Sequence, residues 1–402
     1  MKQDQVTAPL PDGINQSGVR NHNERLVLST IRRHGRLASS EVARKTNLSA
    51  QTASVITRAL EADGFLIRGN PVRGKVGKPL VPMQLNPDGV LSYGLKIGRR
   101  SARLMLVDFT GEVRAERAVT FPYPTPSGIV SFLAENLGAM ADAASNQKRI
   151  AGIGIASPFE LWKWLDTVDA PKHEMMAWKG FSLEAALGRI TDLDVFVGND
   201  ATLGCAAEHM FGAGRALTDF AYFYIGSFVG GGIILGNAVH GGRTGNAGAF
   251  GSMPVRNPSG PDHQLINNAS LYTLERDLQE AGLSTDTLFD PKADWRHFED
   301  LARAWIARSA PHLATASVAA CSVLEFQAIL IDGGVPDWVR RELVRQVSDH
   351  IDRIDTQGIS RPDVLPGSLG RSAGGKGAAY QPIISKYLLG TTPTRRYMTA
   401  DA

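Results

Sequence analysis

Strands that run into glycine-rich turns constrain the fold of this chain more than any other feature. Four such turns lie at Gly198–Asp200, Gly230–Gly232, Asp332–Val335 and Gly367–Gly370. The first three directly follow or lie close behind short apolar runs that have the length of buried strands. Turns of this kind are where α/β folds bind ligands. Four of them predict a two-lobed α/β fold whose crevice is lined by glycine turns, with a hinge near residues 198–201.

Further strands and helices are expected around these turns. A tight turn at Gly98-Arg99-Arg100 joins the first two predicted strands, and small residues follow the last glycine turn. The predicted strands are Tyr93–Gly98, Ser101–Asp108, Val113–Thr120, Ile150–Ile155, Val195–Val197, Phe220–Gly226 and Ala328–Ile331. The predicted helices are Pro126–Ala144, one from Ala201, and Ser372–Tyr380.

The N-terminal part has a different pattern, typical of three short helices. The first is expected from Asn23 to His34, the second behind a cap at Ser39 or Ser40 and ending at Asn47. Ser49 is a good N-cap for a third helix, from Ala50 to about Asp63, which Gly64 stops. We expect Val55, Ile56, Ala59 and Leu60 to form its inner face, and Gln51, Thr52, Ser54 and Arg58 to lie on its outer face.

A predicted hairpin follows the third helix. Its strands are Phe65–Arg68 and Val81–Leu85, and the intervening Gly/Pro loop carries Arg73, Lys75 and Lys78. Two helices joined at Asn47-Leu48-Ser49 and followed by a basic hairpin predict a winged helix-turn-helix that binds double-stranded DNA. Gln51, Thr52 and Ser54 would read bases, while Arg58, Arg73, Lys75 and Lys78 would hold phosphates. The alternative is a small helical domain that docks onto a protein.

The charge distribution agrees with a polyanion partner for this head. Residues 1–85 contain 13 Lys/Arg and 6 Asp/Glu, a balance of +7, so the rest of a chain with net charge +3 carries −4. A well-solvated surface is the alternative explanation. We divide the chain into a flexible arm over 1–20, a winged helix-turn-helix over 21–88 and an effector and oligomerisation domain over 89–402.

Composition excludes several other classes of protein. The sequence contains no apolar run of about 18 residues, so no membrane span is expected. It also has no apolar stretch after the first Lys, so no signal peptide is expected. The two cysteines, Cys205 and Cys321, match no metal spacing. We therefore expect a cytoplasmic protein with reduced thiols and no membrane partner.

Six glycine-rich motifs together resemble those of the ROK family, which groups sugar-responsive repressors and sugar kinases. The resemblance covers about residues 21–390 and implies an actin/hexokinase-like (ribonuclease H-like) domain, here behind a winged helix-turn-helix, in a homodimer or tetramer. Gly77-Lys78-Pro79 stands where the repressor branch has Gly-Arg-Pro. The motifs are Gly94-x-x-Ile97-Gly98, Gly152–Ile155, Gly198–Ala201, Glu208–Gly214, Gly245-Asn246-Ala247-Gly248-x-x-Gly251 and Gly374-x-x-Gly377-Ala378-Ala379.

The phosphate turn departs from the family pattern. Kinases of this family have Asp-x-Gly-Gly-Thr, whereas this chain has Lys96-Ile97-Gly98-Arg99-Arg100. A cation replaces the carboxylate that helps to organise Mg²⁺, and an arginine replaces a glycine that lets the backbone approach phosphate. We expect no phosphoryl transfer and no ATP or Mg²⁺. Arg99 and Arg100 either bind a phosphate or, as we favour, are exposed turn residues.

The sugar and zinc motifs are also altered. Ala249 and Ser252 stand where the family has a sugar-binding Glu and His, and Ile266 stands where it has a second Glu. The zinc knuckle aligns with Asn257-x-Ser259-Gly260-x-x-His263, which lacks all three cysteines, so no zinc is expected. These losses predict an effector that is not a simple hexose bound in the usual way, or no small effector at all.

Asn199 and Asp200 retain the family pattern at the predicted hinge. Asp200 would contact an effector hydroxyl, cap the helix from Ala201, or do both. An aromatic segment beside the crevice is either a ligand wall or core packing; it contains Phe159, Trp162, Trp164, His173 and Trp178. The residues assigned to effector binding are Asn199, Asp200, Ser157, Ala249, Ser252 and Ile266.

These patterns predict a DNA-binding transcriptional regulator, most simply a repressor. A small, carbohydrate-related or altered effector would change the closure of the lobes and so the spacing of two DNA-binding heads. The alternatives are a sugar kinase that retains a DNA-binding head, and a scaffold that binds only proteins. The operator, the effector and the sign of regulation are not encoded in any of these motifs.

Overall fold

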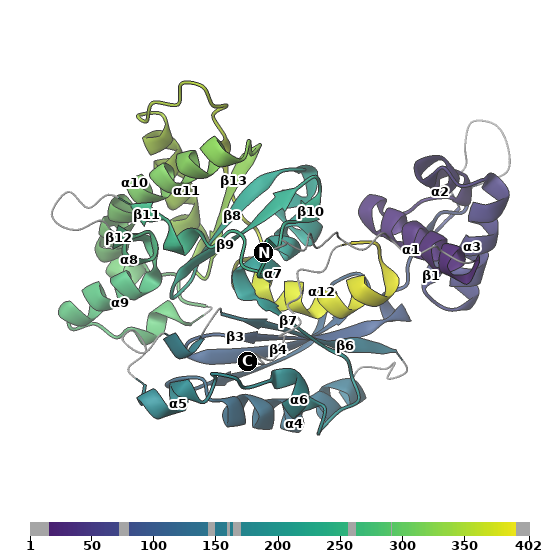
Figure 1. Ribbon diagram of the computed structural model, residues 1–402, viewed down its shortest axis with the longest axis horizontal. Helices are drawn as coiled ribbons and strands as arrows, with labels where there is room; N and C mark the ends of the chain where they lie inside the picture. Colours follow the sequence, from purple (N-terminus) through teal and green to yellow (C-terminus); the bar gives the residue numbers. More distant parts are fainter. Residues whose placement is uncertain are drawn as a thin grey trace, which may run out of the picture. The chain divides into compact units, whose positions relative to one another are not determined.

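The structure is a computed structural model that describes residues 16–71, 80–143, 149–158, 161–163, 170–255, 263–290 and 292–390. The chain divides into two compact units (Figure 1). The first contains the residues up to Gly89 together with Tyr387–Leu389, and the second begins at Val90. Within the described ranges, no helix is both long enough and apolar enough to cross a membrane.

The first unit is the predicted winged helix-turn-helix, with three helices and a two-stranded sheet. Its helices are α1 (Gln16–His34), α2 (Ser39–Thr46) and α3 (Ala50–Ala62). The antiparallel strands β1 (Leu66–Arg68) and β2 (Met83–Leu85) pair Leu66 with Leu85. The tip of the wing, residues 72–79, lies outside the described residues, and so do Arg73, Lys75 and Lys78.

Three local expectations for this unit are corrected. Helix α1 begins at Gln16 rather than Asn23, because a polar helix start leaves no apolar periodicity to reveal it. Neither predicted serine caps α2: Ala38 precedes the helix, and its backbone N–H donates to the Glu41 carboxylate at 2.8 Å. In α3, Val55 is 52% exposed, and Thr57 takes its place in the core.

Thr57 can be buried because its hydroxyl donates to the backbone carbonyl of Ala53 at 2.9 Å. The buried stripe of α3 therefore runs along Ala53, Ile56, Thr57 and Leu60, at spacings of three and four residues. This stripe turns Val55 to the opposite side of the helix. The predicted ends of α3 are confirmed, since Ser49 is its N-cap and Gly64 follows it with a φ of +78°.

The second unit contains two lobes, each with a five-stranded sheet. The first sheet has the order β5-β4-β3-β6-β7 and the second the order β10-β9-β8-β13-β14. In both sheets the second and third strands are antiparallel, and the last three are parallel. The predicted two-lobed α/β architecture is confirmed, and the two lobes share one strand topology.

The predicted strands of the second unit all occur, with small changes at their ends. In the first lobe they are β3 (Leu91–Ile97), β4 (Ser101–Asp108), β5 (Val113–Thr120), β6 (Ile150–Ser157) and β7 (Val195–Asn199). In the second lobe the predicted strands are β8 (Phe220–Ile225) and β13 (Ala328–Gly333). The same sheet also contains β9 (Val229–Leu235), β10 (Ala238–Val239) and β14 (Asp363–Pro366), which were not predicted. A small sheet joins β11 (Pro254–Val255) and β12 (His263–Gln264).

Helices cover the outer face of each large sheet (Figure 1). The outer helices of the first lobe are α4 (Pro126–Ala143), α5 (Lys172–Met176) and α6 (Leu183–Leu187). Those of the second lobe are α8 (Ile266–Ala269), α9 (Leu271–Glu280), α10 (Glu299–Val323) and α11 (Asp337–Ile351). Each set buries its apolar side chains against the strands of its own lobe.

Two helices lie between the two sheets: α7 (Asp200–Phe211) and α12 (Ala373–Tyr387). Helix α12 lies so close to the first sheet that a Cβ at Gly94 or Gly154 would overlap its backbone. Ala156, Leu203 and Ala378 form the apolar contact between β6, α7 and α12. Small residues on β3, β6 and α12 therefore set the spacing of the inner layer.

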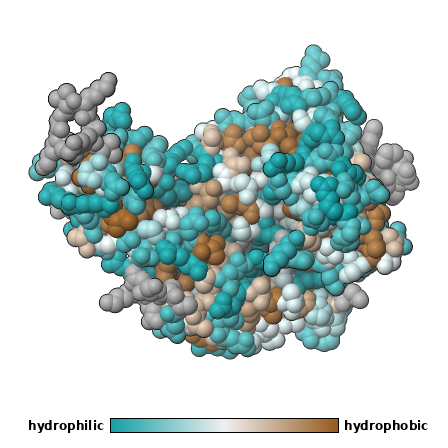
Figure 2. Space-filling view, turned by 180° about the vertical axis from the view of Figure 1, so that it is seen from behind, coloured by the Kyte–Doolittle hydropathy of each residue, from teal (hydrophilic) through white to brown (hydrophobic). Residues whose placement is uncertain are grey.

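On the face drawn in Figure 2, hydrophilic residues cover most of each unit, and hydrophobic residues form separate patches. Among the described residues, the most exposed large hydrophobic side chain is that of Val323 at the end of α10, at 81%.

Candidate functional site

Helix α3 presents a stripe of side chains away from its own core. Gln51, Ser54, Val55 and Arg58 follow the spacing of three and four residues that places them on one face, and Gln51, Val55 and Arg58 are exposed. The guanidinium of Arg58 donates to the backbone carbonyl of Ser54 at 3.1 Å. The stripe combines hydrogen-bonding groups, an apolar group and a cation.

Thr52 has a structural role at the start of the same helix. Its backbone N–H donates to the Ser49 hydroxyl at 3.0 Å, and the two hydroxyls lie 2.8 Å apart. Val55 was not among the predicted contacts, because an apolar residue at this spacing predicts burial. An exposed apolar group among small polar ones is suited to contact a thymine methyl group.

A cavity of about 470 Å³ opens in the second unit. The β3–β4 turn, the β8–β9 hairpin, the junction of β7 and α7, and residues around Phe289 and Arg371 line it. Five of the six predicted effector residues belong to this lining: Asn199, Asp200, Ala249, Ser252 and Ile266. The sixth, Ser157, is 9% exposed and is not part of the lining, although its neighbour Pro158 is.

The cap of α7 is Asn199 and not Asp200, which was the predicted cap, because the helix begins one residue earlier than expected. The Asn199 side chain caps α7 by accepting from the backbone N–H groups of Ala201 at 3.1 Å and Thr202 at 3.0 Å. Asp200 is the first helical residue, and its carboxylate also accepts from Ala201, at 2.9 Å. Burial raises the pKa of Asp200, against the opposing effect of Lys96.

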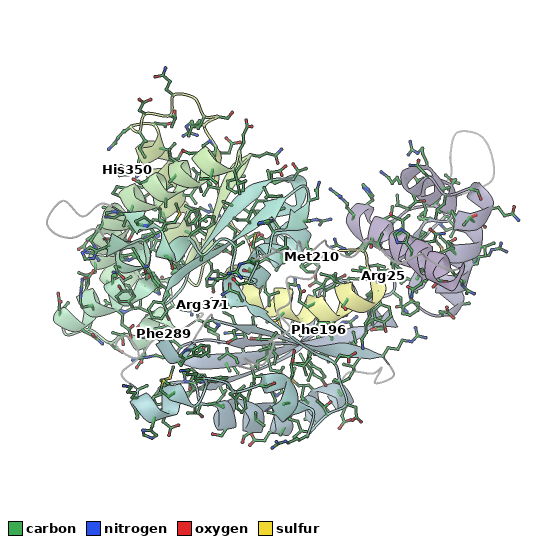
Figure 3. The ribbon with its side chains drawn as sticks, viewed as in Figure 1. Arg25, Phe196, Met210, Phe289, His350 and Arg371 are labelled. Carbon is green, nitrogen blue, oxygen red and sulfur yellow. The ribbon has the colours of Figure 1, made fainter. Side chains whose placement is uncertain are left out.

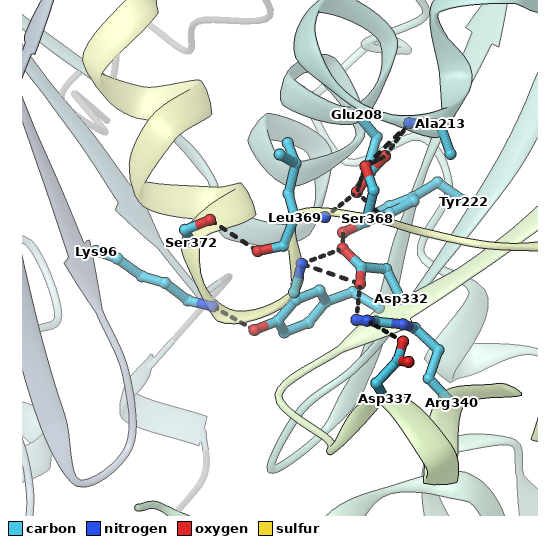
Figure 4. Close-up of polar contacts among 12 residues, drawn as sticks. Lys96, Glu208, Ala213, Tyr222, Asp332, Asp337, Arg340, Ser368, Leu369 and Ser372 are labelled. Carbon is cyan, nitrogen blue, oxygen red and sulfur yellow. Dashed lines mark hydrogen bonds and ion pairs between the residues drawn. The ribbon is translucent and has the colours of Figure 1, made fainter. Parts of the chain in front are cut away.

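Lys96 connects the two lobes at the edge of this cavity (Figure 4). Its ammonium group donates to the Tyr224 hydroxyl at 2.8 Å and lies 4.2 Å from the centre of the Tyr224 ring. Burial acts to lower the pKa of Lys96, but Tyr224 and Asp200 outweigh it, so the pKa is raised. A persistent cation therefore stands where kinases of the family have a carboxylate.

The expectation that both turn arginines are exposed is wrong for Arg99. This residue is only 9% exposed, and its guanidinium forms an ion pair with Glu275 of α9, which is 5% exposed. Arg100 reaches the same carboxylate at 3.5 Å. Both guanidinium groups lie over the ring of Phe289, at 5.7 and 5.4 Å from its centre. Arg99 is buried because the opposite lobe supplies a carboxylate and an aromatic face.

Arg371 lines the cavity and has mainly neutral partners. Its guanidinium donates to the backbone carbonyls of Phe289 at 2.9 Å and Leu288 at 2.7 Å (Figure 3). Burial lowers the pKa of Arg371, and Arg103 lowers it further. Arg371 was not predicted as a site residue. The predicted glycine turn directly before it was the only sequence feature that marked this region as a ligand-binding position.

A buried polar network fixes the turn that carries Arg371 (Figure 4). The Glu208 carboxylate accepts from the backbone N–H groups of Leu369 at 2.6 Å and Ser368 at 2.7 Å. The Asp332 carboxylate accepts from the Gly370 N–H at 3.0 Å and from Arg340 at 3.1 Å. Burial, with the charge of Asp332, raises the pKa of Glu208.

The aromatic segment contributes to the core of the first lobe where it is described. Trp178 is 6% exposed and donates its indole N–H to the Pro124 carbonyl at 2.9 Å. Trp162 packs against the same core, whereas the side chain of His173 is exposed. Neither tryptophan lines the cavity; Phe159 and Trp164 lie outside the described residues.

The described residues contain no cluster of three or more His, Cys, Asp and Glu side chains suited to a metal ion. His263 is exposed on β12, while Asn257 and Ser259 fall outside the described ranges. Cys205 and Cys321 are both buried, in α7 and α10. The aligned knuckle residues do not supply the thiolates that a structural zinc site requires.

Comparison with known proteins assigns both units to families. A model of the ROK family matches residues 92–382, and a model described as winged helix-turn-helix DNA-binding matches residues 20–67. A putative xylose repressor from Caldicellulosiruptor sp. (strain Rt8B.4) is 28% identical over 243 residues, 60% of either chain. The transcriptional dual regulator NagC from Escherichia coli (strain K12) is 24% identical over 259 residues, 64% of this chain and 63% of its own.

The matched region thus spans about 60% of the first of these relatives. Among solved structures, a ROK family transcriptional regulator described as a homolog of the E. coli MLC protein has a TM-score of 0.66 at 20% identity, covering 92% of this chain and 98% of its own. A ROK family glucokinase from Streptomyces griseus, in complex with glucose and AMPPNP, has a TM-score of 0.55 at 24% identity, covering 72% and 98%. These two likenesses concern the fold.

Proposed function

This chain belongs to the ROK family, and we propose that it is a DNA-binding transcriptional regulator, a repressor, whose DNA affinity responds to a small effector in the cavity of its second unit. The observation that carries the proposal is the outward stripe of α3. Gln51, Ser54, Val55 and Arg58 offer the groups that read base edges, thymine methyls and phosphates in a major groove. Relatives described as xylose and N-acetylglucosamine repressors support it.

Genomic footprinting of the tagged full-length protein tests the proposal and identifies operators for binding measurements. We expect Gln51→Ala to weaken operator binding by about 1–3 kcal/mol and to relax the base preference at one position. Arg58→Gln should weaken binding to all sequences and flatten the salt dependence. Arg20→Gln is the control, because Arg20 is an exposed cation of α1 with an ion pair to Glu24. No sequence-specific footprint would overturn the proposal.

We also propose that the second unit transfers no phosphoryl group and uses no ATP, Mg²⁺ or zinc. Its support is the β3–β4 turn, where Arg99 and Arg100 reach Glu275 and cover Phe289. Phosphate binding at this turn would need backbone N–H groups that are open to the ligand. ATP turnover that is lost in Asp200→Asn would favour the alternative, a sugar kinase with a DNA-binding head.

A two-fold symmetric homodimer, or a tetramer built from such dimers, is the proposed assembly. Two heads would then meet two operator half-sites about one helical turn of DNA apart. Sedimentation of the full chain, alone and with an operator, checks the assembly. A scaffold that binds only proteins would instead retain its function when Arg58 is neutralised.

A further inference from the structure

We infer that the effector is an anion, whose carboxylate or phosphate group is bound by Arg371. The inference rests on the proposed regulatory function, because it names the chemical class of ligand for the same cavity. Its starting point is the composition of the wall. Among the described residues that line the cavity, five are cationic and one is acidic: Lys96, Arg99, Arg100, Arg103, Arg371 and Asp200.

Three of the five cations, all arginines of the first lobe, form ion pairs with carboxylates. Arg99 and Arg100 both reach Glu275. Lys96 donates to the Tyr224 hydroxyl, and Asp200 acts on it at longer range. Arg103 pairs with Glu116 at 2.5 Å. These carboxylates largely neutralise the charge of the wall on the side of the first lobe.

Arg371 differs from the other three arginines, because its hydrogen bonds go to two neutral backbone carbonyls. No ion pair to Arg371 occurs among the described residues; Asp290 acts on it only at longer range. A partly buried guanidinium without a carboxylate loses hydration that a bound anion restores. Two carbonyl contacts leave other N–H groups of the five on a guanidinium for a ligand.

The position of Arg371 suits such a contact. Its side chain lies across Gly334, where a Cβ would come 3.5 Å from the Arg371 Cγ. The turn before it is held by Glu208 and Asp332, so the guanidinium is positioned in advance of binding. Preorganisation of this kind reduces the cost of ordering a long side chain when a ligand binds.

The loss of sugar-binding groups points in the same direction. Ala249, Ser252 and Ile266 line the cavity where the family pattern has two carboxylates and an imidazole. A carboxylate in the wall would repel an anion in the cavity, and none of these three side chains carries a negative charge. The cavity has therefore lost acidic groups while retaining a cation without an acidic partner.

Calorimetry on the full-length protein tests the inference with matched probes. D-glucuronate and D-glucose 6-phosphate are each compared with D-glucose, and inorganic phosphate is titrated alone. We expect at least one acid to bind about tenfold or more tightly than glucose, as charge-assisted hydrogen bonds would require. Preference for glucuronate identifies a carboxylate effector, and preference for glucose 6-phosphate with binding of phosphate identifies a phosphate. Glucose binding as tightly as both acids, or no binding by any acid, overturns the inference.

Variants locate the anion site. Arg371→Gln should abolish the preference for the acid, whereas Arg361→Gln, which changes an arginine on the surface of the same unit, should preserve it. If Arg371→Gln does not fold, Arg371→Lys keeps the charge without the planar fork and should weaken the acid selectively. If the folded Arg371 variants still prefer the acid over glucose, the assignment of Arg371 to the anion site is rejected. Operator binding is measured separately, so loss of DNA binding with intact anion binding would reject the proposed function alone.

Discussion

The β3–β4 and β8–β9 hairpins occupy equivalent places in the two sheets, yet they meet the cavity in different ways. In the first lobe the turn carries Arg99 and Arg100, which reach across to α9 of the second lobe. In the second lobe the hairpin carries Gly230, Gly231 and Gly232, and its backbone packs directly against α7 and Phe250. The first hairpin thus makes its contacts through long charged side chains, and the second through the backbone of its glycines.

The difference determines which substitutions and which movements of the lobes each hairpin tolerates. A charged contact between lobes can be replaced by an apolar one of similar size, and it can break when the lobes move. A backbone contact that depends on glycine has no such freedom, because any side chain overlaps its neighbour. We therefore expect the first hairpin to allow changes in lobe closure and the second to hold its lobe together.

The largest expected effect is that of Gly232→Val in the second hairpin. A Cβ at this position would lie 2.6 Å from the Cβ of Cys205, so the substitution separates β9 from α7. We expect a loss of more than about 4 kcal/mol in the free energy of unfolding, measured by denaturant titration. Gly138→Ala is the control, because a Cβ at Gly138 in α4 meets nothing within 4 Å. Equal stability of the two variants would contradict the comparison.

The next effect is expected from Arg99→Met in the first hairpin. Removing Arg99 leaves Glu275 buried with only the longer contact to Arg100, which should cost about 3–5 kcal/mol of stability. The double variant Arg99→Met/Glu275→Met should recover most of this loss. Arg100→Met, at a side chain that is 36% exposed, should cost less than about 1 kcal/mol. A double variant as unstable as the single one would show that the ion pair itself is needed.

The smallest expected effect is a pH dependence on the outer surface of the second lobe. The Arg345 guanidinium hydrogen-bonds to Glu342 at 2.6 Å and lowers the pKa of that carboxyl from 4.5 to about 2. The stabilisation is present above pH 4.5 and is lost as the pH falls towards 2. In Glu342→Gln this loss should disappear, a difference of about 0.2–1 kcal/mol in the free energy of unfolding. If the free energy of unfolding of Glu342→Gln falls with decreasing pH as it does in the wild type, the pair does not stabilise the protein.

The parts of the molecule that depend on local signals were predictable from the sequence. Ser49 and Gly64 define the ends of α3 because caps act within a few residues. The strands, and the junction of β7 and α7 at Asn199 and Asp200, follow from apolar runs and the turns behind them. Five of the six residues assigned to the effector site accordingly line one cavity.

The parts that depend on distant partners were not predictable. Arg99 is buried because Glu275 lies opposite it, and the two are separated by 176 positions in the chain. Arg371 is a candidate anion-binding residue because its hydrogen bonds go to two backbone carbonyls, whereas carboxylates pair with the other arginines of the cavity. Thr57 is buried and Val55 exposed, contrary to the prediction for Val55, because the head packs through a stripe that periodicity alone did not locate.

The position of α12 has a consequence for the synthesis of the chain. Its small residues close the first lobe against β3 and β6, and the Tyr380 hydroxyl donates to the backbone carbonyl of Phe109 at 2.8 Å. Contacts over such a separation are slow to form and enter late in folding. Helix α12 follows every strand of the second lobe in the chain, so the inner face of the first lobe stays open while the second lobe is translated.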